Sequence, residues 1–168
     1  MRNESPGSNP NSPEAILDAF IASRKPQHTD HDELLRTVHF LYGKTLEAAL
    51  VILDSCHNDP RTIVRVVSAA SQRTMHLVKK SSSYGNASEG TASYCCMVGD
   101  RSDDLPFYFC SCRSFLEKSS RPQHSGSSIL CKHLLAVRLW PLLGQVVVDE
   151  TVSDEAFAQQ LAQNVVLD

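Results

Sequence analysis

Three cysteines and one histidine, arranged as two close pairs, constrain this chain more than any other feature. The pairs are Cys110-Ser111-Cys112 and Cys131-Lys132-His133, and eighteen residues separate them. Thiolate sulfur and imidazole nitrogen are the donors that zinc prefers, and four of them complete its tetrahedral coordination. A complete coordination sphere leaves no position for a substrate water. The pattern therefore predicts one structural zinc ion bound by Cys110, Cys112, Cys131 and His133.

The spacing within each pair also predicts the local backbone. Residues two apart on a helix point about 200° away from each other, so Cys131 and His133 can converge only near a helix's first turn. The apolar residues after His133 continue that helix until Pro141 ends or kinks it. Cys110 and Cys112 can share one face of a strand, because side chains alternate with a period of two. We expect a strand and the start of a helix to meet at the metal.

The remaining cysteines and two further histidines are weaker ligand candidates. Cys95 and Cys96 are adjacent, so on a strand they face opposite ways, at most one could approach the ion, and core packing explains them better. His124 lies in a polar stretch typical of a solvated loop. Cys56 and His57 fit the last turn of a helix. The alternative for the two central pairs is that they are ordinary buried thiols and a surface histidine, without metal.

Hydrophobic periodicity predicts helices before residue 60 and mainly strands after it. Ser12 and Pro13 suit the start of a first helix, and Thr29 with Asp32 resembles a capping box for a second. Later β-branched and aromatic runs are typical of strands. The predicted order is helices over 13–25, 29–42 and 45–58, strands over 63–67, 75–77, 91–98 and 107–109, a helix from the metal ligands to about 140, and a helix over 154–166.

These elements predict an α+β fold with a helical amino-terminal half, a small antiparallel sheet, and a zinc-stapled finger followed by a helix. We divide the chain into four regions. Residues 1–28 form a flexible segment with a short helix, and 29–60 form a helical hairpin. Residues 61–148 form a strand-rich region with the finger, whose core is 107–140, and 149–168 form a helix or tail.

Composition excludes some classes of protein. The chain has 168 residues, 42% of them hydrophobic, which is enough to bury one core. No apolar run approaches the roughly 20 residues of a membrane helix, and the first eleven residues lack the basic start and apolar run of a secretory signal. We therefore expect a soluble protein in a reducing compartment, where its six cysteines are thiols or metal ligands rather than disulfides.

The net charge of −3 conceals an uneven distribution along the chain. Residues 1–60 carry five Lys/Arg and nine Asp/Glu, 61–140 carry eleven and five, and 141–168 carry none and five. A basic middle suits an acidic partner or nucleic acid, although a solvated surface of mixed charge also explains it. The residues that could bind DNA directly, with Tyr84 or Tyr94 for stacking, are Arg61, Arg65, Arg73, Lys79 and Lys80.

Nothing in the sequence predicts an enzyme. Gly43-Lys44-Thr45 resembles the end of a nucleotide-binding loop, but the glycine required five residues before Gly43 is replaced by Val38. Paired catalytic carboxylates, a nucleophile elbow and an open metal site are not recognisable either. We therefore expect that this chain binds no nucleotide and catalyses no reaction.

The metal-ligand pattern resembles the SWIM-type zinc finger, which has Cys-x-Cys, a variable gap and Cys-x-His. The resemblance includes a small residue three positions after the histidine, here Ala136, which would let the following helix pack closely. Residues 34–53 and 128–137 are also similar to the small SWIM-domain subunit of the Shu complex. This wider similarity spans roughly Leu34 to Phe157.

The resemblance implies a biological role that spacing alone does not. It implies a nuclear protein that pairs with a RecA-like recombinase paralogue, as a heterodimer or larger complex. That complex would support recombinase filaments on single-stranded DNA during homologous recombination. Two alternatives remain: direct binding of single-stranded DNA, and service as a substrate adaptor of a ubiquitin ligase, which other SWIM-finger proteins perform. The chain looks short for the adaptor role, because that role also needs a cullin-recruiting module.

Overall fold

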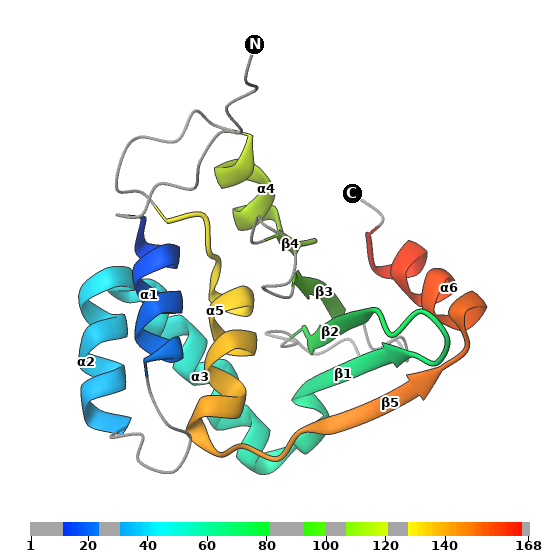
Figure 1. Cartoon of the computed structure of the whole chain (residues 1–168), viewed down its shortest axis with the longest axis horizontal. Helices are drawn as coiled ribbons and strands as arrows, with labels where there is room; N and C mark the ends of the chain where they lie inside the picture. The colour runs from blue at the N-terminus through cyan, green and yellow to red at the C-terminus, as the bar shows by residue number, and fades with distance from the viewer. Residues whose placement is uncertain (1–11, 24–30, 81–92, 100–106, 121–127, 166–168) are drawn as a thin grey trace, which may run out of the picture.

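The structure is a computed structural model that describes residues 12–23, 31–80, 93–99, 107–120 and 128–165 (Figure 1). Thr29 and its capping box, the 81–90 loop with Tyr84, and His124 lie outside the described residues. The elements are α1 (Pro13–Ala22), α2 (His31–Tyr42), α3 (Lys44–Asn58), a 3-10 turn (Pro60–Thr62), β1 (Ile63–Ser68), β2 (Thr74–Lys79), β3 (Ser93–Val98), β4 (Tyr108–Cys110), α4 (Arg113–Ser119), α5 (Lys132–Leu139), a 3-10 turn (Trp140–Leu143), β5 (Val148–Val152) and α6 (Asp154–Val165). None of the described helices is long and apolar enough to cross a membrane.

Short-range signals explain where the amino-terminal helices begin and end. The Ser12 side chain caps α1 by accepting a hydrogen bond from the Ala15 N–H at 3.1 Å, with Pro13 at the first helical position, as the sequence predicts. Gly43 has a φ of 49°, a conformation that favours glycine, and it turns the chain from α2 into α3. The Gly-Lys-Thr sequence thus joins two helices, whereas a phosphate-binding loop follows a strand.

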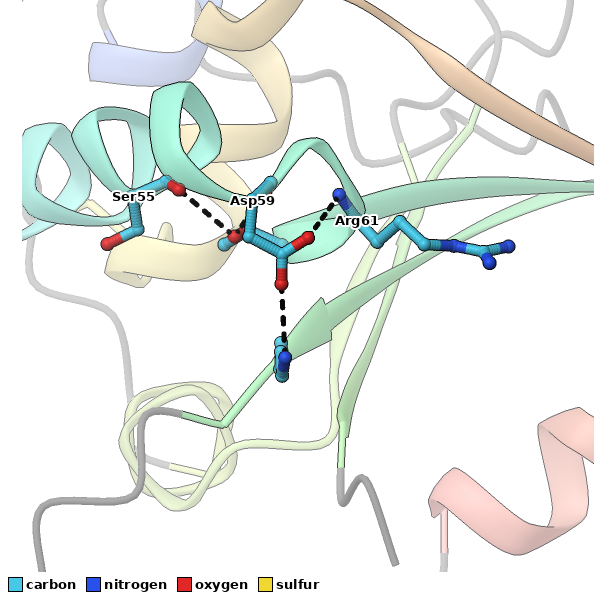
Figure 2. A network of polar contacts seen from close by, with 5 residues as sticks. Ser55, Asp59 and Arg61 are labelled. Atoms are coloured by element: carbon cyan, nitrogen blue, oxygen red, sulfur yellow. Dashed lines mark hydrogen bonds and ion pairs between the residues drawn. The ribbon is translucent and has the colours of Figure 1, made fainter.

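Asp59 organises the passage from α3 to the sheet (Figure 2). Its backbone N–H donates to the Ser55 carbonyl at 3.0 Å, while one carboxylate oxygen accepts from the Arg61 N–H at 3.0 Å. The other oxygen accepts from the Lys79 ammonium at 3.1 Å. These hydrogen bonds, the one from Lys79 foremost, lower the pKa of Asp59. Asp59 therefore ties the end of α3 to the end of β2.

The α+β class is confirmed, but the sheet is mixed rather than antiparallel throughout. Its strand order is β4-β3-β2-β1-β5, with antiparallel neighbours except for the parallel pair of β1 and β5. The region over 149–168, predicted to be a helix or tail, begins instead within a strand, β5, and only then continues as α6. In the sheet, Asp149 of β5 pairs with Arg65 of β1 at 2.6 Å, and Glu150 pairs with Arg61 of the 3-10 turn before β1.

Helices cover both faces of the sheet (Figure 1). On one face, Ile63, Val78, Cys96 and Cys110 join the main core with α3 and α5, while α1 and α2 pack further out. On the other face, Val64, Val66, Met75 and Cys95 pack against Phe157 of α6. Strand alternation separates the two sets, as adjacent Cys95 and Cys96 illustrate. It also directs Cys110 toward α5.

Helix α1 is docked on the finger by buried polar contacts as well as by Leu17, which is fully buried. The buried Glu14 carboxylate accepts from the Ser128 hydroxyl at 2.5 Å and from the Ile129 N–H at 3.0 Å. One turn later, Asp18 forms an ion pair with Arg138 of α5. Arg138 also donates to the Tyr108 hydroxyl at 2.7 Å, so α1, α5 and β4 share one polar network.

The Asp18–Arg138 pair generates a stability prediction, because its arginine side chain is only 9% exposed. Arg138→Met should lower the free energy of unfolding by about 2 to 4 kcal/mol, since it leaves the Asp18 carboxylate without its main cation. Arg61→Met is the matched control, because it breaks an exposed pair and should cost under about 1 kcal/mol. Urea unfolding of the zinc-loaded protein measures both. Equal effects of the two substitutions would contradict this account.

Candidate metal centre

The four predicted ligands come from three neighbouring elements. Cys110 ends β4, and Cys112 is the N-cap of α4. Cys131 is the N-cap of α5, and His133 lies in its first turn. The prediction that a helix begins at the second pair is therefore confirmed. Both Cys112 and Cys131 therefore stand at helix N-termini.

The four side chains converge as a closed metal site requires. Their donor atoms all lie within 4.8 Å of one another, and all four residues are buried. His133 Nδ1 lies 3.8 Å from Cys110 Sγ and 4.0 Å from Cys131 Sγ. A tetrahedral zinc ion, with Zn–S near 2.3 Å and Zn–N near 2.0 Å, places neighbouring donors roughly 3.5 to 3.8 Å apart. The cluster is compatible with one structural zinc ion.

The protonation chemistry of the cluster also fits a bound cation. Hydrogen bonds from the Cys110 and Cys131 thiols hold the pKa of Cys112 far below its ordinary value. In turn, the hydrogen bond with Cys112 raises the pKa of Cys110, and that with Cys110 raises the pKa of Cys131. Three adjacent buried thiols therefore cannot all ionise without a compensating positive charge. A divalent ion supplies that charge, and zinc requires the thiolate forms as ligands.

The surroundings hold the ligands in place. The Phe115 N–H donates to Cys112 Sγ at 3.4 Å, and Lys118 of α4 donates to the Leu130 carbonyl at 3.0 Å, just before Cys131. The Tyr94 ring of β3 stacks on His133 with a centroid distance of 4.2 Å. Ala136 is fully buried on α5, which packs against α3, as expected for the small residue of the motif. Of these surrounding residues, only Ala136 could be identified from the sequence, through its spacing from His133.

A fifth thiol lies beside the cluster. Cys96 Sγ is 3.6 Å from Cys110 Sγ, because the two residues are direct partners on β3 and β4. Cys95 instead faces the other side of the sheet, 3.9 Å from Met75 Sδ. The expectation that at most one of the adjacent pair approaches the metal is thus consistent with the geometry. A weak S–H donor next to a thiolate ligand is a suitable outer contact.

Three of the five basic residues considered for DNA binding already have carboxylate partners. Arg61, Arg65 and Lys79 each pair with a carboxylate, from Glu150, Asp149 and Asp59 respectively. Arg73 is exposed just before β2. Lys80 differs, because its ammonium lies 5.0 Å from the centroid of the Tyr94 ring, next to the metal centre. Their role in DNA binding stays a prediction.

The metal centre generates a direct test. Cys131→Ser should reduce zinc from about one ion per chain to nearly none and unfold the finger, because a binding free energy of roughly 10 kcal/mol is comparable with the stability of a whole domain. Cys95→Ala is the control, since it alters an equally buried cysteine outside the cluster. Elemental analysis and circular dichroism measure metal and folding. A folded, zinc-free Cys131→Ser protein would show that the ion is dispensable.

Comparison with known proteins agrees with this geometry. Residues 94–137 match the SWIM zinc finger family. The chain is 30% identical to zinc finger SWIM domain-containing protein 7 of Homo sapiens over 126 residues, which cover 75% of this chain and 73% of the human protein. It is 29% identical to the Mus musculus protein of the same name over 130 residues, covering 77% and 70%. No solved structure matches the chain significantly. The chain therefore belongs to the family of zinc finger SWIM domain-containing protein 7.

Proposed function

We propose that this chain is the non-catalytic, zinc-binding subunit of a Shu-type complex in the nucleus. It pairs there with a RecA-like recombinase paralogue and promotes homologous recombination by supporting recombinase filaments on single-stranded DNA. The observation that carries the non-catalytic role is the buried set of four ligands, which takes every coordination position of the ion. The resemblance over residues 34–157 supports the choice of complex.

The geometry of the finger suits an adaptor. The ligands join β4 to the starts of α4 and α5, and α5 in turn packs against α3 and β3. Metal binding thereby fixes the outer surface formed by these elements, as a structural ion does in other small zinc-binding units. A surface of this kind can bind a partner without any chemistry at the metal.

Any ATP chemistry belongs to the partner in this proposal. The Gly43-Lys44-Thr45 sequence lies at a helix–helix junction, where Gly43 serves the turn. A RecA-like subunit would carry its own phosphate-binding loop and contribute it to the complex. The division of roles is therefore a zinc-stabilised adaptor and a nucleotide-binding partner.

Native mass spectrometry of the tagged full chain, purified from cells of its own organism, tests the partnership. We expect one zinc ion and one RecA-like subunit to accompany the chain. Cys131→Ser should lose both, because the finger no longer folds, whereas Cys95→Ala should keep both. Purification of the folded, zinc-loaded chain without any RecA-like protein would refute the proposed pairing.

A cellular measurement tests the role in filament support. Cells that lack this chain should form fewer recombinase foci after DNA breakage, because fewer filaments persist on single-stranded DNA. Expression of the wild-type chain or of Cys95→Ala should restore the foci, while Cys131→Ser should not. Unchanged foci in the deficient cells would contradict filament support even if the partner were found.

A further inference from the structure

Two hollows that share part of their lining adjoin each other on the surface beside the metal centre. One has a volume of about 410 Å³ and lies where α3, α4 and α5 begin, and the other, of about 430 Å³, follows α3 to its end. The two share four lining residues, Ala48, Tyr94, Lys132 and His133. We call the two hollows together the α3 trough. The zinc ligand His133 thus contributes to its wall.

One wall of the α3 trough is apolar. Ala48, Val51 and Ile52 line it, followed by the polar Ser55, and their spacing places all four residues on one face of α3. Val51 is 67% exposed. Single exposed aliphatic side chains are common, but Val51 lies beside other apolar side chains, and exposed apolar groups that lie together often mark a binding site. The wall therefore offers a short apolar stripe to a ligand.

The remaining walls are basic. Lys44, Lys79, Lys80, Lys118, Lys132 and Arg113 line the α3 trough, against a single carboxylate among its described lining residues, Asp59. That carboxylate is held by Lys79 and by the Arg61 N–H. Arg113 also has a partner, Glu117 at 2.7 Å. The excess of positive charge therefore rests mainly on lysines, and it favours an acidic ligand.

Two observations favour an acidic protein segment over a nucleic acid. The Tyr94 ring already stacks on His133 at 4.2 Å and has the Lys80 ammonium 5.0 Å from its centroid, so a base that stacked on Tyr94 would compete with these contacts. The apolar stripe at Val51 also makes no favourable contact with a charged phosphate backbone, whereas an aliphatic side chain of a peptide would bury it. A peptide segment with carboxylates next to an apolar residue can contact both the basic walls and the apolar wall.

We propose that the α3 trough binds an acidic segment of a partner protein, with its carboxylates facing Lys44, Lys80 and Lys132 and an apolar side chain against Val51. The inference rests on the proposed adaptor function, to which it adds the docking surface and the chemistry of the partner's segment. Charge complementarity would set specificity and association rate, and burial of Val51 would add affinity.

Site-specific photo-crosslinking in the full, zinc-loaded chain tests the proposal. A benzophenone amino acid at Val51 should crosslink to a partner segment that is net negative and contains aliphatic residues, as identified by peptide sequencing. The control position is Phe40, which is 89% exposed on α2 and outside the α3 trough. Adding Lys44→Glu and Lys80→Glu should reduce the Val51 crosslink by roughly tenfold or more, through charge repulsion. Zinc content should remain at one ion per chain.

Several outcomes would overturn the proposal. They are a crosslink to a basic or neutral segment, a crosslink to a second copy of this chain, equal yield at Phe40, and a yield unaffected by the two Lys→Glu changes. Fluorescence anisotropy with a thymidine oligonucleotide of about 30 nucleotides provides the other arm. Oligonucleotide binding that the two Lys→Glu changes abolish would assign the α3 trough to single-stranded DNA instead.

The crosslinking experiment tests the docking surface and the purification tests the partnership, so the failure of one can be told from the failure of the other. If a RecA-like subunit accompanies the chain but the Val51 crosslink is absent, the adaptor function stands and the docking surface is elsewhere. If no RecA-like subunit is found but an acidic, aliphatic segment of another protein crosslinks in a lysine-dependent manner, the α3 trough stands and the proposed complex falls.

Discussion

Coordination of one ion by four side chains is the interaction on which the carboxy-terminal half depends. The elements that supply the ligands are short: β4 has three residues, α4 seven and α5 eight. Helices of this length are not stable by themselves in water, because they form too few hydrogen bonds to offset the unfavourable free energy of nucleation. Thiolate and imidazole coordination replaces the missing local stability with a long-range link, and places two helix N-termini and a strand end around the same point.

The finger is not an autonomous unit, because its ligands belong to the main hydrophobic core. Cys110, Cys112 and Cys131 lie in the same apolar cluster as Leu17 of α1 and Leu53 of α3. Polar contacts reinforce this continuity, since α1 binds the segment before Cys131 and also the last turn of α5. Metal coordination and helix packing are therefore parts of one cooperative structure, in contrast to a small finger that folds around its ion alone.

Features that depend on neighbouring residues were predictable from the sequence, and features that depend on distant pairing were not. The ligand spacing, the Ser12 cap and the start of α5 follow from local geometry. The parallel pairing of β5 with β1 joins segments more than eighty residues apart, and only this pairing brings Arg61 and Arg65 to their two carboxylates. The same pairing engages charges that looked free for DNA, whereas Lys44 and Lys132 gather at Tyr94 only through the tertiary fold. The composition shows that the middle of the chain is basic, but which of its basic side chains have carboxylate partners depends on the topology of the fold.

In the proposed adaptor role, the function of this chain lies on the surface that the metal stabilises. His133 illustrates the connection, because its Nδ1 faces the thiols while its ring stacks on Tyr94 in the wall of the α3 trough. Cys131 and His133 also flank Lys132, so the backbone that the ion fixes is the backbone that presents a lysine to the trough. Coordination thus sets the position of charge at the surface. Recognition can then be specific without any ligand ever reaching the ion, since a preorganised charge loses less entropy when it pairs with its partner.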